Sequence, residues 1–208
     1  MSTSYELLES FGLTSLMQKQ FAQYADLLIE ANKNFNLTAI IDKEEVYAYH
    51  FYDSLMLAKV LDMHTIKAFA DIGAGGGFPS IPLKIVYPHL ATHCIEVNLK
   101  KAEFLQHIAQ TLELQEVNIH TLDWRTFLRT THEPIPLFVA RASLQVDELI
   151  RMFQPSSPYR LSKLVYWASD HWKPTAKEKP YIHTIYPYMV HNKARKLVVL
   201  QLPAQDGK

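Results

Sequence analysis

Residues 70–79 read Ala70-Asp71-Ile72-Gly73-Ala74-Gly75-Gly76-Gly77-Phe78-Pro79, and this stretch decides the fold. It overlaps a short apolar run from Ala68 to Ile72, which is typical of a buried parallel strand, and it holds four of the chain's six glycines. Glycine lets the backbone turn sharply and approach a ligand closely, and proline is tolerated in the first turn of a helix. The pattern therefore predicts a strand, a tight loop at a ligand site, and a helix start.

The same alternation of strand and helix continues along the chain. Further strands are predicted at residues 92–97, 117–121, 137–140 and 164–168, and helices at 81–87, 99–112 and 146–153. Alternating elements of this kind predict an α/β fold, a doubly wound sheet with helices on both faces. Two apolar segments near the end of the chain, 181–186 and 197–202, predict a terminal antiparallel hairpin.

The N-terminal part of the chain has a helical pattern instead. Met17, Phe21, Tyr24 and Leu28 recur at steps of four, three and four, so they share one face of a helix expected over residues 15–34 and pack on a core. Asp42 precedes a glutamate at the capping-box position, which predicts a second helix continuing towards residue 60. We expect an N-terminal helical extension over residues 1–65 and a nucleoside-binding domain over 66–208.

Composition excludes several kinds of protein. Lys plus Arg and Asp plus Glu each total 21, so the chain as a whole does not attract nucleic acid or an anionic membrane. A single cysteine, Cys94, excludes an intrachain disulfide, and the ten histidines show no metal-ligand spacing, so no metal is expected. Because neither a long apolar run nor a leader pattern is present, we expect a cytoplasmic protein with no membrane partner, and a monomer.

Two acidic residues indicate what the glycine loop binds. Asp71 directly precedes the loop, and Glu96 ends the next predicted strand, where an acid can accept hydrogen bonds from ribose hydroxyls. A dinucleotide fingerprint would have a glycine at the sixth position, where Phe78 stands, and Asp71 would lie unfavourably near a pyrophosphate. S-adenosylmethionine has no phosphate and carries an ammonium group, so it suits these acids, with Gly73 and Gly75 approaching it. The alternative is a tight turn without a ligand.

Two later positions at the same sheet edge allow a functional and a structural interpretation. Trp124, next to Arg125, can stack on adenine, or it can form the buried face of a short helix capped by Asp123. Arg141 can contact the cofactor or an RNA phosphate, or it can form an ion pair with a nearby carboxylate. The basic runs at residues 100–101 and 193–196 can bind RNA phosphates or simply be solvated.

Several motifs occur in a characteristic order: Asn32-Lys33-Asn34-Phe35-Asn36-Leu37-Thr38, His50-Phe51-Tyr52-Asp53-Ser54, the glycine loop with Phe78-Pro79, Ile95-Glu96-Val97-Asn98-Leu99-Lys100-Lys101, and Ala140-Arg141-Ala142. In these the chain resembles the bacterial ribosomal RNA small subunit methyltransferase G family, also called glucose-inhibited division protein B. The chain departs from the family pattern at three places. Tyr49 replaces its arginine, Ser80 replaces its glycine, and Trp167-Ala168-Ser169 replaces a Lys-Gly pair.

The resemblance implies a Rossmann-like class I methyltransferase sheet, S-adenosylmethionine as cofactor, and methylation of N7 of one guanine in 16S ribosomal RNA or the 30S particle. It also implies cofactor contacts at Gly73, Phe78, Trp124, Arg125 and Arg141. No catalytic acid or base is expected, because guanine N7 already has a free lone pair at neutral pH. The neutral charge and the altered C-terminal segment leave two alternatives open. These are a small-molecule methyltransferase and a non-catalytic cofactor-binding module that acts on the ribosome.

Overall fold

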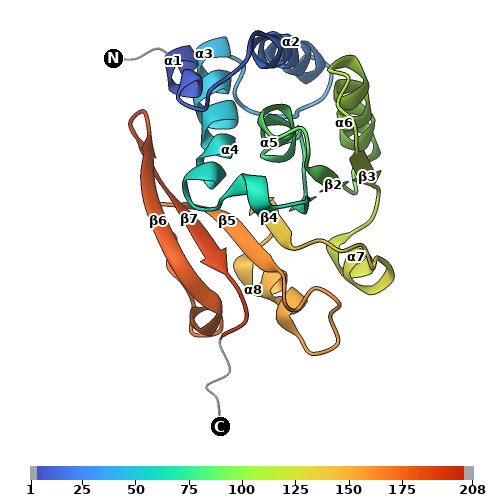
Figure 1. The fold of residues 1–208 in the computed structure, drawn as a ribbon, viewed down its shortest axis with the longest axis vertical. Helices are drawn as coiled ribbons and strands as arrows, with labels where there is room; N and C mark the ends of the chain where they lie inside the picture. Colours follow the sequence, from blue (N-terminus) through green and yellow to red (C-terminus); the bar gives the residue numbers. More distant parts are fainter. Residues whose placement is uncertain (1–3, 204–208) are drawn as a thin grey trace.

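A seven-stranded sheet forms the centre of the molecule, in the order β3-β2-β1-β4-β5-β7-β6 (Figure 1). The computed structural model describes residues 4–203 of the chain. Strands β1 to β5 run parallel, whereas β7 is antiparallel to both β5 and β6. The strands are β1 Ala68–Ile72, β2 Ala91–Ile95, β3 Val117–His120, β4 Leu137–Arg141, β5 Lys163–Ser169, β6 Ile182–Val190 and β7 Lys193–Leu200.

These strands confirm the α/β fold and the terminal hairpin predicted from the sequence. The largest difference among the parallel strands is at β2, which was expected to reach residue 97 and ends at Ile95. The hairpin is longer than predicted, because its two strands pair from Ile182 with Leu200 to Val190 with Lys193. The polar residues at the start of β7, which the prediction did not include, therefore also pair with β6.

Strand β1 is the point at which the order of the sheet reverses. It pairs with β2 on one side and with β4 on the other. The connections after β1 and after β4 therefore diverge, and a doubly wound sheet leaves a crevice at the carboxyl ends of its strands at such a point. The glycine loop follows β1 directly into this crevice.

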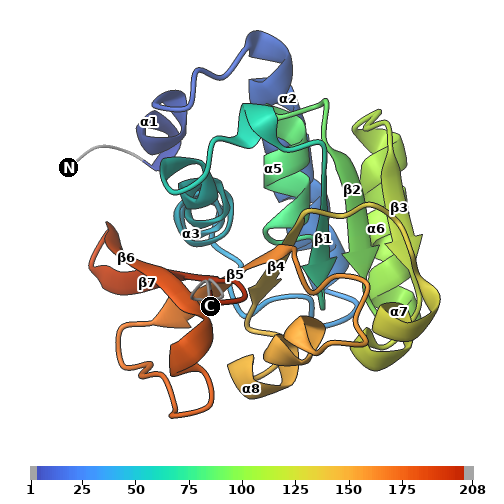
Figure 2. The same ribbon diagram turned by 60° about the horizontal axis from the view of Figure 1, so that its bottom comes forward.

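Helices cover both faces of the sheet (Figure 2), and alternation along the strands separates two hydrophobic cores. Phe69 belongs to the core beneath the N-terminal helices, α5 (Ser80–Val86) and α6 (Leu99–Thr111), whereas its neighbour Ala70 belongs to the other core. The second core lies beneath α7 Trp124–Thr130, α8 Val146–Leu149 and the 3-10 turn η4 Ile150–Phe153. A further 3-10 turn, η5 Lys179–Tyr181, precedes β6.

The N-terminal part is helical up to residue 65, as predicted. Its elements are α1 Ser4–Glu9, α2 Ser15–Asn32, α3 Lys43–Val46, the π-helical turn η1 Tyr47–Tyr52, α4 Asp53–Leu55, and the 3-10 turns η2 Met56–Lys59 and η3 Met63–Thr65. Asp42 caps α3 by accepting a hydrogen bond from the Glu45 backbone N–H. Helix α2 ends two residues before the predicted position, at Asn32.

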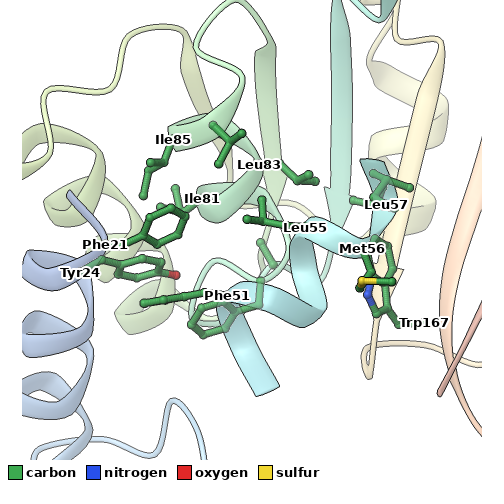
Figure 3. Close-up of a cluster of buried hydrophobic side chains, with 14 of the residues drawn as sticks. Phe21, Tyr24, Phe51, Leu55, Met56, Leu57, Ile81, Leu83, Ile85 and Trp167 are labelled. Carbon is green, nitrogen blue, oxygen red and sulfur yellow. The ribbon is translucent and has the colours of Figure 1, made fainter. Parts of the chain in front are cut away.

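These N-terminal helices share a core with the sheet. Figure 3 shows Phe21 and Tyr24 from α2 and Phe51 from η1 packed against Ile81 of α5. Phe21, Tyr24 and Leu28 are buried, and Met17 packs at the edge of the core, so the predicted helical face is confirmed. The division of the chain at residues 65 and 66 stays a prediction.

Candidate functional site

A cavity of about 670 Å³ opens at the carboxyl ends of β1, β2 and β4. Its walls are the glycine loop, the residues after β2 and β4, the start of α7, the N-terminal loop with Thr38, and His50 of the π-helical turn η1. Small-molecule sites have volumes of roughly 300–1,000 Å³. The cavity is lined by most of the site residues predicted from the sequence, namely Gly73, Gly75, Phe78, Glu96, Trp124, Arg125 and Arg141.

The glycine loop needs its glycines for two different reasons. Gly73, Gly75 and Gly77 have φ angles of 72°, 58° and 95°, a region that other residues rarely adopt. In addition, a Cβ on Gly73 would lie 2.5 Å from the Cβ of Ser143, and one on Gly77 would lie 2.7 Å from the Tyr24 hydroxyl. Tyr24 also donates a hydrogen bond to the Gly76 carbonyl, so helix α2 holds the loop in place.

Asp71 is not part of the cavity wall. Its side chain is fully buried beneath the loop, and its Oδ2 accepts a hydrogen bond of 3.1 Å from the Ser80 backbone N–H. Within the described residues its Oδ1 has no hydrogen-bond partner, and burial raises the pKa of this carboxyl to about 7. In this structure Asp71 ties the end of β1 to the start of α5, so any effect on a ligand passes through the loop.

Glu96 presents a carboxylate at the cavity wall, beside the glycine loop. Its oxygens accept hydrogen bonds from the backbone N–H groups of Gly75 and Asn98, at 2.9 and 2.8 Å. The side chain is 7% exposed and lines the cavity. Because a carboxylate has about four lone-pair sites, two remain that can accept hydroxyl groups of a ligand.

At the start of helix α7, Trp124 fits both of the interpretations that the sequence left open. Asp123 caps the helix by accepting the backbone N–H groups of Arg125 and Thr126, and Trp124 packs its ring edge-on against Phe138 at 5.5 Å. Trp124 is therefore the buried face of a capped helix, and it also lines the cavity. Its indole Nε1 has no hydrogen-bond partner among the described residues.

Arg125 and Arg141 both form ion pairs. Arg125 makes a bidentate pair with Glu148 at the rim of the cavity, with N···O distances of 2.8 and 3.0 Å. Arg141 is largely buried and contacts Asp53 Oδ2 at 3.0 Å and the Tyr49 carbonyl at 3.1 Å. The ion-pair interpretation of Arg141 is confirmed, and a contact between Arg141 and a cofactor stays a prediction.

His50 and Thr38 complete the wall, and the sequence analysis gave neither residue a role. His50 stacks on Phe78 at 4.2 Å, its Nδ1 lies 2.7 Å from Arg141 Nη2, and its Nε2 lies 2.7 Å from Thr38 Oγ1. Burial, followed by the charge of Arg141, lowers the pKa of His50 to about 3. The only signal in the sequence was that both residues belong to the motifs quoted above. A local pattern does not reveal the contact between His50 and Arg141, which are 91 positions apart.

Two of the residues that depart from the family pattern, Tyr49 and Trp167, make hydrogen bonds to distant parts of the chain. The Tyr49 hydroxyl donates to Asn192 in the turn between β6 and β7, and the Lys193 ammonium lies 3.9 Å from the centre of the Tyr49 ring. The Trp167 indole donates to the Asp53 carbonyl at 2.9 Å. Tyr49 therefore ties the β6–β7 turn to the π-helical turn that carries His50, and Trp167 ties β5 to the residue that follows this turn.

Residues 17–192 match the family model described as rRNA small subunit methyltransferase G. The chain belongs to this family. Curated members from Macrococcus caseolyticus and Bacillus thuringiensis, each named ribosomal RNA small subunit methyltransferase G, are 41% and 47% identical over 150 and 153 residues. These matches cover 71% and 72% of this chain but only 62% and 64% of the relatives. The chain therefore spans less than two thirds of the length of these methyltransferase G relatives.

Solved structures agree with this membership of the methyltransferase G family at the level of the fold. A putative O-methyltransferase from Klebsiella pneumoniae has a TM-score of 0.60 at 13% identity, covering 87% of this chain and 90% of its own. A mutant of MtNAS in complex with S-adenosylmethionine has a TM-score of 0.56 at 14% identity, covering 89% of this chain and 73% of its own. The seven-stranded sheet is thus the Rossmann-like class I methyltransferase sheet that the sequence predicted.

Residues 4–203 of this family member contain neither a metal-binding cluster nor a membrane-spanning helix. No group of three or more His, Cys, Asp or Glu side chains in that range could hold a metal ion. None of the helices described there is both long and apolar enough to cross a membrane.

Proposed function

We propose that this protein is an S-adenosylmethionine-dependent methyltransferase that methylates N7 of a guanine in 16S ribosomal RNA. The proposal is carried by Glu96, which the backbone of Gly75 and Asn98 holds rigidly at the cavity wall. An acid at the end of the second strand accepts the hydroxyls of a ribose. The ring of Phe78 fills the position where a dinucleotide fingerprint has its third glycine, and this favours a nucleoside cofactor without a pyrophosphate.

Each part of the cavity wall has a role in this proposal. The backbone of Gly73 and Gly75 approaches the cofactor closely, and Glu96 binds its ribose. The ring of Trp124, which lines the cavity, lies against the adenine. The guanidinium of Arg141 lies over the ring of Phe78 at 5.3 Å, and we assign these two side chains to the end of the cofactor that carries the reactive methyl group.

The reaction needs little acid or base chemistry from the protein. The bound cofactor supplies an electrophilic methyl group, and guanine N7 attacks with a lone pair that is free at neutral pH. The residues of this chain therefore act by positioning the two reactants and by excluding water. We nominate no catalytic base.

Ribosomal RNA, as 16S RNA or as the 30S particle, is the proposed partner. The N7 edge lies in the deep, narrow major groove of A-form RNA, so an accessible loop or a displaced base suits this cavity. Lys101 at the cavity wall and Lys193 beside Tyr49 are candidate phosphate contacts. A ribosomal substrate also supports the expected cytoplasmic location.

Incorporation of label tests the proposed function directly. The full chain is incubated with tritiated S-adenosylmethionine and either 16S RNA or 30S particles from a strain that lacks this methyltransferase. We expect label in N7-methylguanine of the 16S RNA. Absence of label from both RNA substrates contradicts the proposal. Label found only in metabolites supports a small-molecule methyltransferase, and cofactor binding without turnover supports a non-catalytic module.

The role of Glu96 is tested by Glu96→Gln. The amide keeps the size of the side chain but turns one acceptor into a donor, which then faces a backbone N–H. We expect the affinity for S-adenosylmethionine, measured by titration calorimetry, to fall at least about 10-fold. The matched control is Glu103→Gln on the exposed side of α6, for which the affinity should stay within about twofold. Equal affinities for the two variants would refute the assignment of Glu96.

A further inference from the structure

The hydroxyl of Thr38 lies at the cavity wall in a loop that is fixed by several hydrogen bonds. The side-chain oxygen of Asn32, at the end of α2, accepts the backbone N–H groups of Leu37 and Thr38 at 2.8 and 3.0 Å. Leu37 and Thr38 both line the cavity. The loop therefore presents the Thr38 side chain to the cavity from outside the sheet.

The direction of the hydrogen bonds around His50 follows from Arg141. A guanidinium only donates, so His50 Nδ1 must accept the contact of 2.7 Å from Arg141 Nη2. A neutral imidazole that accepts at one nitrogen carries its proton on the other. His50 Nε2 therefore donates to Thr38 Oγ1 at 2.7 Å. The low pKa of His50, about 3, agrees with a ring that is neutral at neutral pH.

The Thr38 oxygen accepts a second hydrogen bond, from the Ile40 backbone N–H at 3.0 Å. A hydroxyl oxygen has two lone pairs, so both are now used. The Thr38 O–H is left as a donor, and no acceptor for it is present in the described part of the chain. His50 and Ile40 thus fix a single hydrogen-bond donor at the cavity wall.

We propose that the Thr38 hydroxyl donates a hydrogen bond to O6 of the target guanine and thereby selects guanine over adenine. This inference rests on the proposed function. Guanine presents two acceptors on this edge, N7 and O6, and O6 is the one that remains when N7 reacts. Adenine has an amino group in place of O6, so a donor would face a donor. The ribose and adenine contacts assigned above lie on the sheet and α7, whereas Thr38 belongs to the N-terminal loop.

The test compares Thr38→Val with Thr38→Ser in the full chain. Valine keeps the shape but removes the donor together with the oxygen that accepts from His50 and Ile40, whereas serine retains the hydroxyl. Methylation of 30S particles with tritiated S-adenosylmethionine gives kcat/KM, and calorimetry gives the cofactor affinity. For T38V we expect kcat/KM to fall about 10-fold to 100-fold while the cofactor affinity stays within about twofold. T38S should keep kcat/KM within about threefold of wild type. The control T65V removes a hydroxyl that bonds Asp62 away from the cavity, and it should leave both values unchanged.

Particles with adenine at the methylated position complete the test. The ratio of kcat/KM for guanine particles to kcat/KM for adenine particles should be at least about 10-fold smaller in T38V than in wild type, because the donor that opposes the adenine amino group is gone. An unchanged preference overturns the inference. The inference is also overturned if a loss of cofactor affinity accounts for the whole loss of kcat/KM in T38V, or if kcat/KM falls equally in T38S. If the wild-type chain methylates no RNA, the proposed function itself has failed, and the inference fails with it. Thermal unfolding of T38V, with cofactor binding retained, verifies that the variant is folded.

Discussion

At the scale of single residues, Gly73 and Gly12 share nearly the same backbone angle but differ in their surroundings. Their φ angles are 72° and 69°, and a Cβ on Gly12 would meet nothing within 4 Å, whereas one on Gly73 would lie 2.5 Å from Ser143. Gly73→Ala and Gly12→Ala therefore share the backbone strain, about 1 kcal/mol, and only Gly73→Ala adds a steric clash. Comparison of these two variants therefore separates the cost of the left-handed backbone from the cost of the steric clash.

We expect Gly73→Ala to lower the free energy of unfolding by about 2–4 kcal/mol and to weaken S-adenosylmethionine binding at least about 10-fold. Gly12→Ala should lower the free energy of unfolding by about 1 kcal/mol and leave cofactor affinity unchanged. Urea denaturation and calorimetry measure the two quantities. The same loss of affinity in both variants would show that the clash with Ser143 is unimportant for binding.

The raised pKa of Asp71 predicts how the stability of the fold depends on pH. Burial raises its pKa from the usual 3.8 to about 7, so the folded protein keeps a proton that the unfolded chain releases between those values. The unfolded state then binds fewer protons, and the contribution of Asp71 to stability falls as pH rises from about 4 to about 7. Asp71→Asn removes this dependence, so the stability of Asp71→Asn relative to wild type should rise across that range, by about 4 kcal/mol at most.

His50 titrates in the opposite sense, and it must be separated from Asp71. Its pKa is lowered to about 3 in the folded state, so its contribution to stability is lost as pH falls below about 6.5. Because both proteins contain His50, the difference between Asp71→Asn and wild type cancels this term. Chemical denaturation at pH 4.5, 6 and 8 gives that difference. A difference that does not change with pH would mean that Asp71 is ionised in the fold.

At the scale of elements, the cap of α7 connects local structure to the cavity. Asp123 accepts the backbone N–H groups of the first turn, which carries Trp124 and Arg125 into the wall. We expect Asp123→Ala to lower the midpoint of thermal unfolding by a few degrees and to weaken cofactor binding. Asp123→Ser should restore both quantities in large part, because serine also caps helices.

The control for this cap is Asp62, which caps the short turn η3 by accepting the His64 backbone N–H. Asp62→Ala should cost stability without weakening cofactor binding, because Asp62 does not line the cavity. Scanning fluorimetry and calorimetry measure the two effects. Loss of cofactor affinity in Asp62→Ala would mean that the effect of Asp123→Ala reports global stability rather than the position of Trp124.

The π-helical turn η1 is the element that the sequence did not predict. The capping signal at Asp42 predicted a helix continuing towards residue 60, and residues 43–59 are helical. Its backbone, however, changes from α to π over Tyr47–Tyr52 and then to α again. Such turns occur often at functional sites, and this one carries His50 to the cavity wall. Apolar spacing differs too little between α and π turns to reveal the change.

At the scale of the whole molecule, Asp53 joins segments from both ends of the chain. Its carboxylate pairs with Arg141 of β4 and accepts a hydrogen bond from the Tyr188 hydroxyl of β6, and its carbonyl accepts the Trp167 indole of β5. Buried charges need all their partners, because an unpaired one costs its full desolvation. The N-terminal turn and the C-terminal hairpin are thus coupled at one carboxylate.

We expect Tyr188→Phe to lower the free energy of unfolding by about 1–3 kcal/mol, because it leaves an oxygen of the buried Asp53 without this donor. The slope of unfolding against urea should not change, since both ends of the chain unfold together. Tyr186→Phe is the control, as Tyr186 lies on the same strand and is half-buried, and it should cost less than about 0.5 kcal/mol. Two separate transitions in Tyr188→Phe would contradict the coupling.

Local chemistry in the sequence was sufficient for most of the fold and part of the site. Strand alternation, the glycine loop and the spacing to Glu96 predicted the doubly wound sheet and the cavity at its carboxyl edge, because backbone geometry and side-chain periodicity act over a few residues. Only the tertiary structure decided that Asp71 lies beneath the loop and not in the cavity wall. It alone also decided that Arg141, His50 and Thr38 form one chain of hydrogen bonds. The contact between Arg141 and His50 joins residues 91 positions apart, and it depends on how the helical N-terminal part packs against the sheet, which no local pattern contains.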